Sequence, residues 1–157
     1  ITRCLVGSEM CIRDRSLIDV GSSLHIGARG PTNDSTVFNH TREVGYGLIN
    51  GSELFKTGLN NTAKRVVKTL KGRSVYLCFD MDFFDPSCAP GVCTPTWGGA
   101  TSREGLEFLQ NLAGLNLVGA DINTVSPPHD ISGMTAFLAA TVGLEILTLF
   151  CHSKNLI

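Results

Sequence analysis

The sequence carries almost no net charge, and this limits its partners. Its 13 Lys and Arg residues are balanced by 14 Asp and Glu residues, for a formal net charge of -1 at pH 7. The basic residues are scattered along the chain and form no patch. Nucleic acids and anionic membrane surfaces are recognised chiefly by clustered positive charge. We therefore predict that neither is a partner of this protein.

Paired cysteine motifs are also missing. The chain has six cysteines, and none of them forms a CxxC pair with another. This spacing favours neither a zinc ribbon nor a redox motif. Reduced thiols are typical of the cytosol, so we predict a cytoplasmic protein. An organelle address in a native N-terminus that this chain lacks stays open as an alternative.

No uninterrupted apolar run is long enough to cross a bilayer. The longest helical candidate, residues 133–150, contains Glu145 and several threonines, which favours a core helix. With 157 residues, of which 43% are hydrophobic, the chain is long enough for one core and too short for two comfortable domains. We expect one partial domain.

The first fifteen residues lack the periodicity of either a helix or a strand. Their stretch CLVGSEMCIRDR resembles sequencing adaptor that has been translated as protein, so we interpret residues 1–15 as a non-native segment. A genuine disordered or targeting terminus is the alternative. On the first interpretation, residues 16–157 are the C-terminal part of a longer domain.

Strand-like and helix-like segments alternate through the rest of the chain. Expected strands are 24–27, 46–49, 75–79 and 115–120, and expected helices are 39–44, 61–71, one opening at a Thr101–Glu104 capping box and one starting near Ser132. The strand at 75–79 lacks polar alternation, which predicts burial on both faces. This order predicts an α/β fold with a parallel sheet and helices on both faces.

Two carboxylates stand one residue apart where the strand at 75–79 should end. Alternate side chains of a strand point to the same face, so Asp80 and Asp82 should project together into a cleft beyond it. Mutual repulsion and desolvation would disfavour two ionised carboxylates there unless a cation is bound. Oxygen ligands suit manganese or magnesium. Carboxylates that cap the following turn are the alternative.

Other polar residues follow the expected strands, where ligands bind in parallel sheets. Asp121 ends the strand at 115–120. Asp85 precedes a proline, as turn-forming residues often do, and metal binding is the alternative for Asp85. His129 and His25 could be metal ligands, general acids or ordinary hydrogen-bonded histidines. Trp97, the only tryptophan, lies in the long loop 85–100 and could wall a small pocket or simply pack.

Two further kinds of chemistry fit the residues less well. Cys93 could act as a nucleophile, but no base partner is evident in the sequence. The DxD spacing also occurs in phosphotransferases of the haloacid dehalogenase type. Those enzymes usually continue with a small glycine-threonine turn, whereas Asp82 is followed by Phe83-Phe84-Asp85-Pro86.

Three motifs together carry a family resemblance. FDMDFFDPSCAPGVCTPTWGG, LVGADINTVSPPHD and ISGMTAFLAAT resemble the C-terminal half of the ureohydrolase superfamily, the arginases and agmatinases. The resemblance implies a three-layer α/β/α sandwich, homo-oligomers, and a dinuclear manganese site that hydrolyses a guanidino group to release urea. It also implies that Asp80 bridges the two metals and that Asp82 binds one of them.

The sequence departs from that family pattern in three respects. Cys78 replaces the serine of the usual Ser-x-Asp-x-Asp motif. Thr124 stands where arginases and agmatinases have the glutamate that pairs with the guanidinium, and a neutral hydroxyl does not replace a bidentate carboxylate. The GGDHS-like and DAHxD-like motifs, which supply the other metal ligands, are absent. We therefore expect the fragment to be inactive alone.

Thr124, together with Thr96-Trp97, resembles the guanidine hydrolase branch of the superfamily, in which the metal can be nickel and the substrate is free guanidine. Trp97 would then fill the channel that accepts the tail of a longer substrate, and we include His129 with Thr124 and Trp97 as substrate-binding candidates. The rival hypothesis is a non-catalytic homologue with a structural or assembly role, which the Thr124 substitution keeps open.

Overall fold

The computed structural model describes residues 17–31, 36–154 and 156, so segment 1–15 lies outside the described residues. Strands alternate with helices, as predicted. The strands are β1 (Leu24–Ala28), β2 (Gly47–Asn50), β3 (Ser74–Asp80) and β4 (Asn116–Asn123). The α-helices are α2 (Val37–Glu43), α3 (Gly51–Thr57), α4 (Leu59–Thr69), α5 (Ser102–Gln110) and α6 (Met134–Ser153), and the 3-10 turns are η1 (Val20–Ser22), η2 (Met81–Phe83) and η3 (Pro127–His129).

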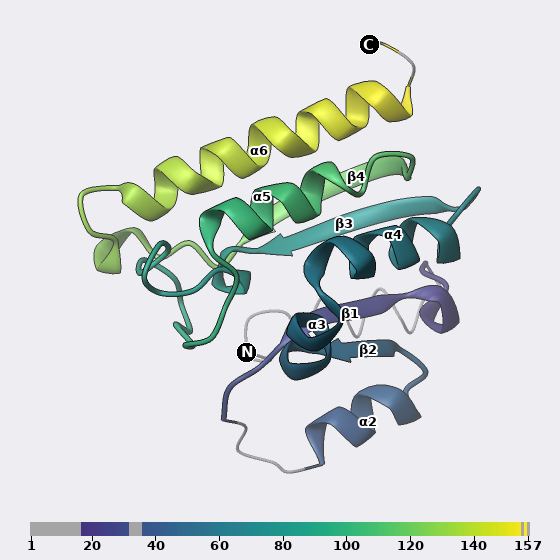
Figure 1. Cartoon of the computed structure of the whole chain (residues 1–157), viewed down its shortest axis with the longest axis horizontal. Helices are drawn as coiled ribbons and strands as arrows, with labels where there is room; N and C mark the ends of the chain where they lie inside the picture. Colours follow the sequence, from purple (N-terminus) through teal and green to yellow (C-terminus); the bar gives the residue numbers. More distant parts are fainter. Residues whose placement is uncertain (1–16, 32–35, 155, 157) are drawn as a thin grey trace.

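All four strands are paired in parallel. β1 pairs with β2, and β3 pairs with β4 from Ser74↔Asn116 to Asp80↔Asn123. Within the described residues these are two separate two-stranded sheets. Figure 1 shows β3 and β4 with their carboxyl ends at the left, where the loop after β3 and the turn η3 also lie. This edge carries the candidate site.

Helices cover the β3–β4 sheet incompletely in the described part of the chain. Exposed and half-buried residues alternate along β3, and Tyr76 is 59% exposed. The prediction that this strand is buried on both faces is therefore wrong for the described residues, because none of them covers the face with Tyr76 and Cys78. A strand that lacks polar alternation need not have two covered faces.

The final helix shows the same incomplete cover. Val142, Ile146 and Leu149 of α6 are buried, whereas Phe137 is 76% exposed and Leu147 is also exposed. Among the described residues α6 therefore has an uncovered apolar side, which differs from the core helix that the sequence predicted. It is long and apolar enough to cross a membrane, a weak test that core helices of soluble proteins also pass.

An aromatic cluster anchors the segment that follows β3. The rings of Phe79, Phe83 and Phe84 pack against one another with centroids 5.6 to 6.1 Å apart, and Phe108 of α5 lies 5.6 Å from Phe83. Gly105 makes room for this packing, since a Cβ there would lie 2.1 Å from the Phe84 ring. Packing of these rings against the core fixes the turn η2, which contains Asp82 and directly follows Asp80.

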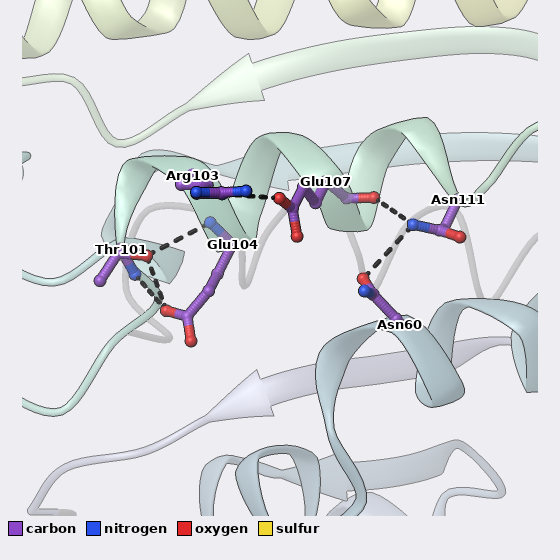
Figure 2. A network of polar contacts seen from close by, with 6 residues as sticks. All are labelled: Asn60, Thr101, Arg103, Glu104, Glu107 and Asn111. Carbon is purple, nitrogen blue, oxygen red and sulfur yellow. Dashed lines mark hydrogen bonds and ion pairs between the residues drawn. The ribbon is translucent and has the colours of Figure 1, made fainter.

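The start of α5 fixes the other end of the long loop. Thr101 and Glu104 form the predicted capping box, in which each side chain bonds the main chain of the other residue (Figure 2). Further along the helix, Arg103 pairs with Glu107, and the Asn111 side chain bonds Asn60 of α4 at 3.3 Å. The loop 85–100 thus runs between two firmly anchored elements.

Candidate metal and substrate site

The two central carboxylates lie at the carboxyl end of β3. Asp80 is the last residue of the strand and is half-buried, while Asp82 lies in η2 and is only 7% exposed. Because the strand stops at Asp80, strand alternation does not orient Asp82, and that part of the sequence argument is wrong. The aromatic cluster and the contacts of Asp82 itself fix its position instead.

Hydrogen bonds hold Asp82 at both its side chain and its main chain. The Thr94 hydroxyl donates to Oδ2 of Asp82 at 2.8 Å. The main-chain N–H of Asp82 donates to Oγ1 of Thr124 at 3.2 Å, and Arg29 donates to its main-chain oxygen. A buried carboxylate held in this way loses little conformational freedom when it binds a cation.

Arg29, the residue after β1, bonds main-chain oxygens both just before the loop 85–100 and near its end. Its Nη2 also donates to the carbonyl oxygens of Phe84 at 3.0 Å and Thr96 at 2.9 Å. Burial lowers the pKa of Arg29 from its ordinary value, while the charges of Asp82 and Asp85 act in the opposite direction. Arginine stays protonated in proteins, so a cation lies beside the acidic residues.

Asp85 organises the loop, which confirms its expected role as a turn former. Its carboxylate accepts from the main-chain N–H groups of Ser87 at 3.0 Å, Gly98 at 2.8 Å and Gly99 at 3.2 Å. Hydrogen bonds from Ser87, followed by those from Gly99 and Gly98, lower the pKa of Asp85 to about 2. These bonds stabilise the ionised form, and they join the two ends of the loop.

Thr124 follows β4 and contacts the acidic segment directly. Its φ is +70°, an unusual value for a β-branched residue. Its Oγ1 accepts from the N–H of Asp82, and its carbonyl accepts from the N–H of Cys93 at 2.9 Å. The structure therefore brings this predicted substrate-binding residue to the predicted metal ligand, with its oxygen already engaged.

The other two substrate-binding candidates lie in loops at the same edge of the sheet. Trp97 is 76% exposed, and His129 is an exposed residue of η3 whose Nδ1 lies 2.8 Å from the Ser126 hydroxyl. Of these three candidates, Thr124 is the one that forms a hydrogen bond with Asp82 within the described residues. His25 lies on β1 with its ring against Tyr46, at a centroid distance of 4.7 Å.

Asp121 does not lie where the sequence placed it. β4 continues to Asn123, so Asp121 is inside the strand, opposite Cys78. Its carboxylate accepts from the Tyr76 hydroxyl and the Asn123 amide, each at 2.7 Å. Although Cys78 lies on the uncovered face of the sheet, partial desolvation of its sulfur, followed by the hydrogen bond and the charge of Asp121, raises the pKa of Cys78 to about 12, so this thiol stays protonated. The two hydrogen bonds of Asp121 thus go to residues of the β3–β4 pair, and neither of them involves Asp80 or Asp82.

Sequence reasoning missed Arg29 and Thr94. Arg29 could have been found, because it follows a strand at the sheet edge where ligands bind. Nothing in the sequence pairs Thr94, which is in an irregular loop, with Asp82 twelve residues before it. Contacts of this kind depend on how a loop closes, and its composition does not specify that.

The two aspartates are the right type of ligand for a divalent metal, but they are too few to complete a metal centre. Carboxylate oxygens are suitable ligands for manganese or magnesium, and Asp80 and Asp82 supply them. Within the described residues, however, no group of three or more His, Cys, Asp or Glu side chains could hold an ion. A complete centre needs ligands from beyond this set.

Comparison with known proteins gives the family. The model of the arginase family matches residues 7–148, a match that begins inside segment 1–15. Guanidinopropionase of Pseudomonas aeruginosa is 36% identical over 140 residues, which are 89% of this chain and 44% of that protein. The mitochondrial guanidino acid hydrolase of Homo sapiens is 34% identical over 134 residues, 85% of this chain and 38% of that protein.

Solved structures agree with the sequence matches. The proclavaminate amidino hydrolase of Streptomyces clavuligerus superposes with a TM-score of 0.84 at 35% identity, covering 92% of this chain and 48% of that one. The arginase of Bacillus caldovelox gives a TM-score of 0.74 at 31% identity, covering 85% and 44%. This chain thus spans less than half the length of these relatives. The fold is arginase-like, the haloacid dehalogenase alternative is set aside, and the chain belongs to the arginase family.

Proposed function

We propose that residues 16–157 are the C-terminal part of a single ureohydrolase domain, and that the complete protein hydrolyses a guanidino C–N bond to release urea. Family membership supports the reaction class, since relatives are named guanidinopropionase and agmatinase. The observation that carries the proposal is the Asp80–Asp82 pair at the end of β3, with Asp82 buried and held by Thr94.

Asp80 and Asp82 would hold two divalent ions, manganese in the first instance and nickel as the alternative. Such ions, when bound, lower the pKa of water and polarise the group under attack. This chain's own contribution is orientation: Thr94 fixes one carboxylate oxygen of Asp82, and Thr124 fixes its main chain. The remaining ligands would come from residues beyond those described here.

The proposed substrate is free guanidine. In this reaction water adds to the guanidinium carbon, one C–N bond breaks, and the products are urea and ammonium. Thr124 supports this substrate, because a hydroxyl engaged with Asp82 cannot form the bidentate pair that a glutamate makes with a guanidinium. Trp97, in the loop that follows β3, and His129, in the turn that follows β4, would close the space that a longer substrate's tail needs.

A direct test compares substrates on the full-length protein. Guanidine, agmatine and guanidinobutyrate would each be supplied to the manganese-loaded and the nickel-loaded protein, with urea as the measured product. We expect guanidine to give the highest kcat/KM. A clear preference for agmatine would contradict the guanidine assignment and leave the ureohydrolase reaction in place.

A non-catalytic homologue is the second candidate, because Thr124 is bound to Asp82 where the family has a substrate-binding glutamate. The two candidates differ in what the full-length protein releases. Absence of urea from all three substrates, in a folded protein that has bound metal, would favour the non-catalytic role.

We further propose a reducing compartment such as the cytosol, and a homo-oligomer, as the family resemblance implies. Four cysteines in the described residues, Cys78, Cys88, Cys93 and Cys151, are free thiols, which agrees with such a compartment. One relative is named as mitochondrial, so an organelle stays open. Light scattering of the full-length protein would give its oligomeric state.

A further inference from the structure

A single side chain ties the two halves of the candidate site together. Nη2 of Arg29 donates to the carbonyl oxygen of Asp82, the proposed metal ligand, and to that of Thr96, next to the proposed pocket residue Trp97. A third bond goes to Phe84, whose ring is in the aromatic cluster. Asp82 and Thr96 are fourteen residues apart in sequence, yet one guanidinium group binds both.

The surroundings of Arg29 are shaped to admit it. A Cβ at Gly99 would lie 2.5 Å from Nη2 of Arg29, so a larger residue there would displace the guanidinium. Asp85 accepts from the N–H groups of Gly98 and Gly99 and holds the same stretch of loop in place. Arg29 thus lies in a close-fitting position between two ordered segments, in the field of Asp82 and Asp85.

Its hydrogen bonds distinguish Arg29 from an ordinary counter-ion. Its guanidinium is bonded to main-chain oxygens, while the Asp82 carboxylate accepts from Thr94. The cation therefore leaves that carboxylate available to a metal and fixes the backbone that carries it. All three bonds come from Nη2, whose two N–H groups are shared among three carbonyl oxygens. A lysine at this position would instead carry a compact, strongly hydrated charge on a flexible stem.

We propose that Arg29 is a positioning residue that couples metal binding at Asp82 to substrate selection at the Thr96–Trp97 segment. This inference rests on the proposed function. Its specific consequence is that loss of the guanidinium alters both properties at once, whereas loss of the Thr94 hydroxyl, whose hydrogen bond within the described residues goes to the Asp82 carboxylate, weakens metal binding alone.

The test uses the full-length protein with Arg29→Lys, Arg29→Gln and Thr94→Val. Metal affinity is measured by Mn²⁺ titration without turnover, and selectivity is measured as the ratio of kcat/KM for guanidine and agmatine. We expect Arg29→Lys to weaken Mn²⁺ binding by about 10-fold or more, as loss of outer-shell support typically does, and to reduce the preference for guanidine. Thr94→Val should weaken Mn²⁺ binding and leave that preference unchanged.

Two controls separate positioning from general stability. Arg103→Gln removes an exposed guanidinium on α5 that is paired with Glu107, and it should change neither quantity. Leu109→Ala opens a cavity in the core and should lower Tm, with metal affinity and selectivity unchanged at temperatures where the protein is folded. Arg29→Lys keeps the charge, so the comparison remains informative if Arg29→Gln does not fold.

The outcomes are distinguishable. Normal metal affinity and normal selectivity in Arg29→Lys, in a protein whose wild type binds metal, would overturn the coupling and leave the proposed function intact. Weakened metal binding with unchanged selectivity would also overturn the coupling. A folded wild-type protein that binds neither Mn²⁺ nor Ni²⁺ would overturn the proposed function, and the coupling with it.

Discussion

At the scale of single residues, Thr124 is the residue on which the proposed substrate depends most. It is β-branched, has a φ of +70°, and accepts a hydrogen bond from Asp82 across the sheet edge. The motif resemblance predicted a substitution at Thr124, but the contact of Thr124 with Asp82 could not be predicted, because it depends on where η2 turns. Residues held in sparsely populated backbone regions concentrate at functional sites.

The Thr124 hydroxyl can be tested by an isosteric change. Thr124→Val keeps the branched shape and removes the acceptor, so the half-buried N–H of Asp82 loses its partner. We expect the free energy of unfolding to fall by about 1 to 2 kcal/mol, measured by urea denaturation. Thr124→Ser, which keeps the hydroxyl, is the matched control, and equal stability losses in the two variants would show that this hydrogen bond contributes nothing.

Asp85 predicts a defined pH dependence. Its pKa is lowered to about 2 from 3.8, so the folded state favours the ionised form. Its contribution to stability is complete above the unfolded value and is lost as the pH falls between about 4 and 2, because the unfolded state takes up the proton first. In urea titrations, the stability advantage of wild type over Asp85→Asn should shrink across this window. A constant difference would contradict this role.

At the scale of secondary-structure elements, the sequence predicted the strands and most helices but missed α3. Periodicity and the capping box located α4 and α5, because those signals are local. α3 follows β2 directly, and its only marker is the cap in which Asn50 accepts from Glu53. The ends of β3 and β4 depend on pairing between the strands, and the sequence did not predict them correctly. Asp82 was therefore placed in line with a strand that stops at Asp80, and Asp121 was placed after a strand that continues to Asn123.

The α5 capping box also makes a measurable prediction. Thr101→Ala removes the side-chain acceptor for the Glu104 N–H and should lower the free energy of unfolding by about 1 kcal/mol. Thr101→Ser keeps the acceptor and should remain close to wild type in the same denaturation experiment. An alanine variant as stable as wild type would mean that tertiary packing alone holds the start of α5.

At the scale of the whole molecule, the chain presents surfaces that a complete domain would be expected to cover. In the described residues, Tyr76 on β3 and Phe137 on α6 are largely exposed. No strand of the β1–β2 sheet is hydrogen-bonded to a strand of the β3–β4 sheet within these residues. The chain also spans less than half the length of its relatives. Sequence motifs predicted the fold class and one edge of the candidate site, whereas the contacts of Arg29 and Thr94 with Asp82 depend on how the loops close and could not be placed.

Metal binding by the 157-residue chain should therefore differ from that of the full-length protein. Two aspartates are too few to hold two ions, and the described residues offer no group of three ligands. Calorimetry with Mn²⁺ or Ni²⁺ should detect no tight binding to the 157-residue chain and clear binding to the full-length protein. Tight binding by the short chain would show that the ligand set has been misassigned.

Urea release by the full-length protein after Asp82→Asn, with bound metal counted in the same sample, tests the central claim most directly. This account predicts about two divalent ions per wild-type chain, fewer in the variant, and loss of urea release together with the metal. A folded Asp82→Asn protein that retains its metal and releases urea at the wild-type rate would contradict the account.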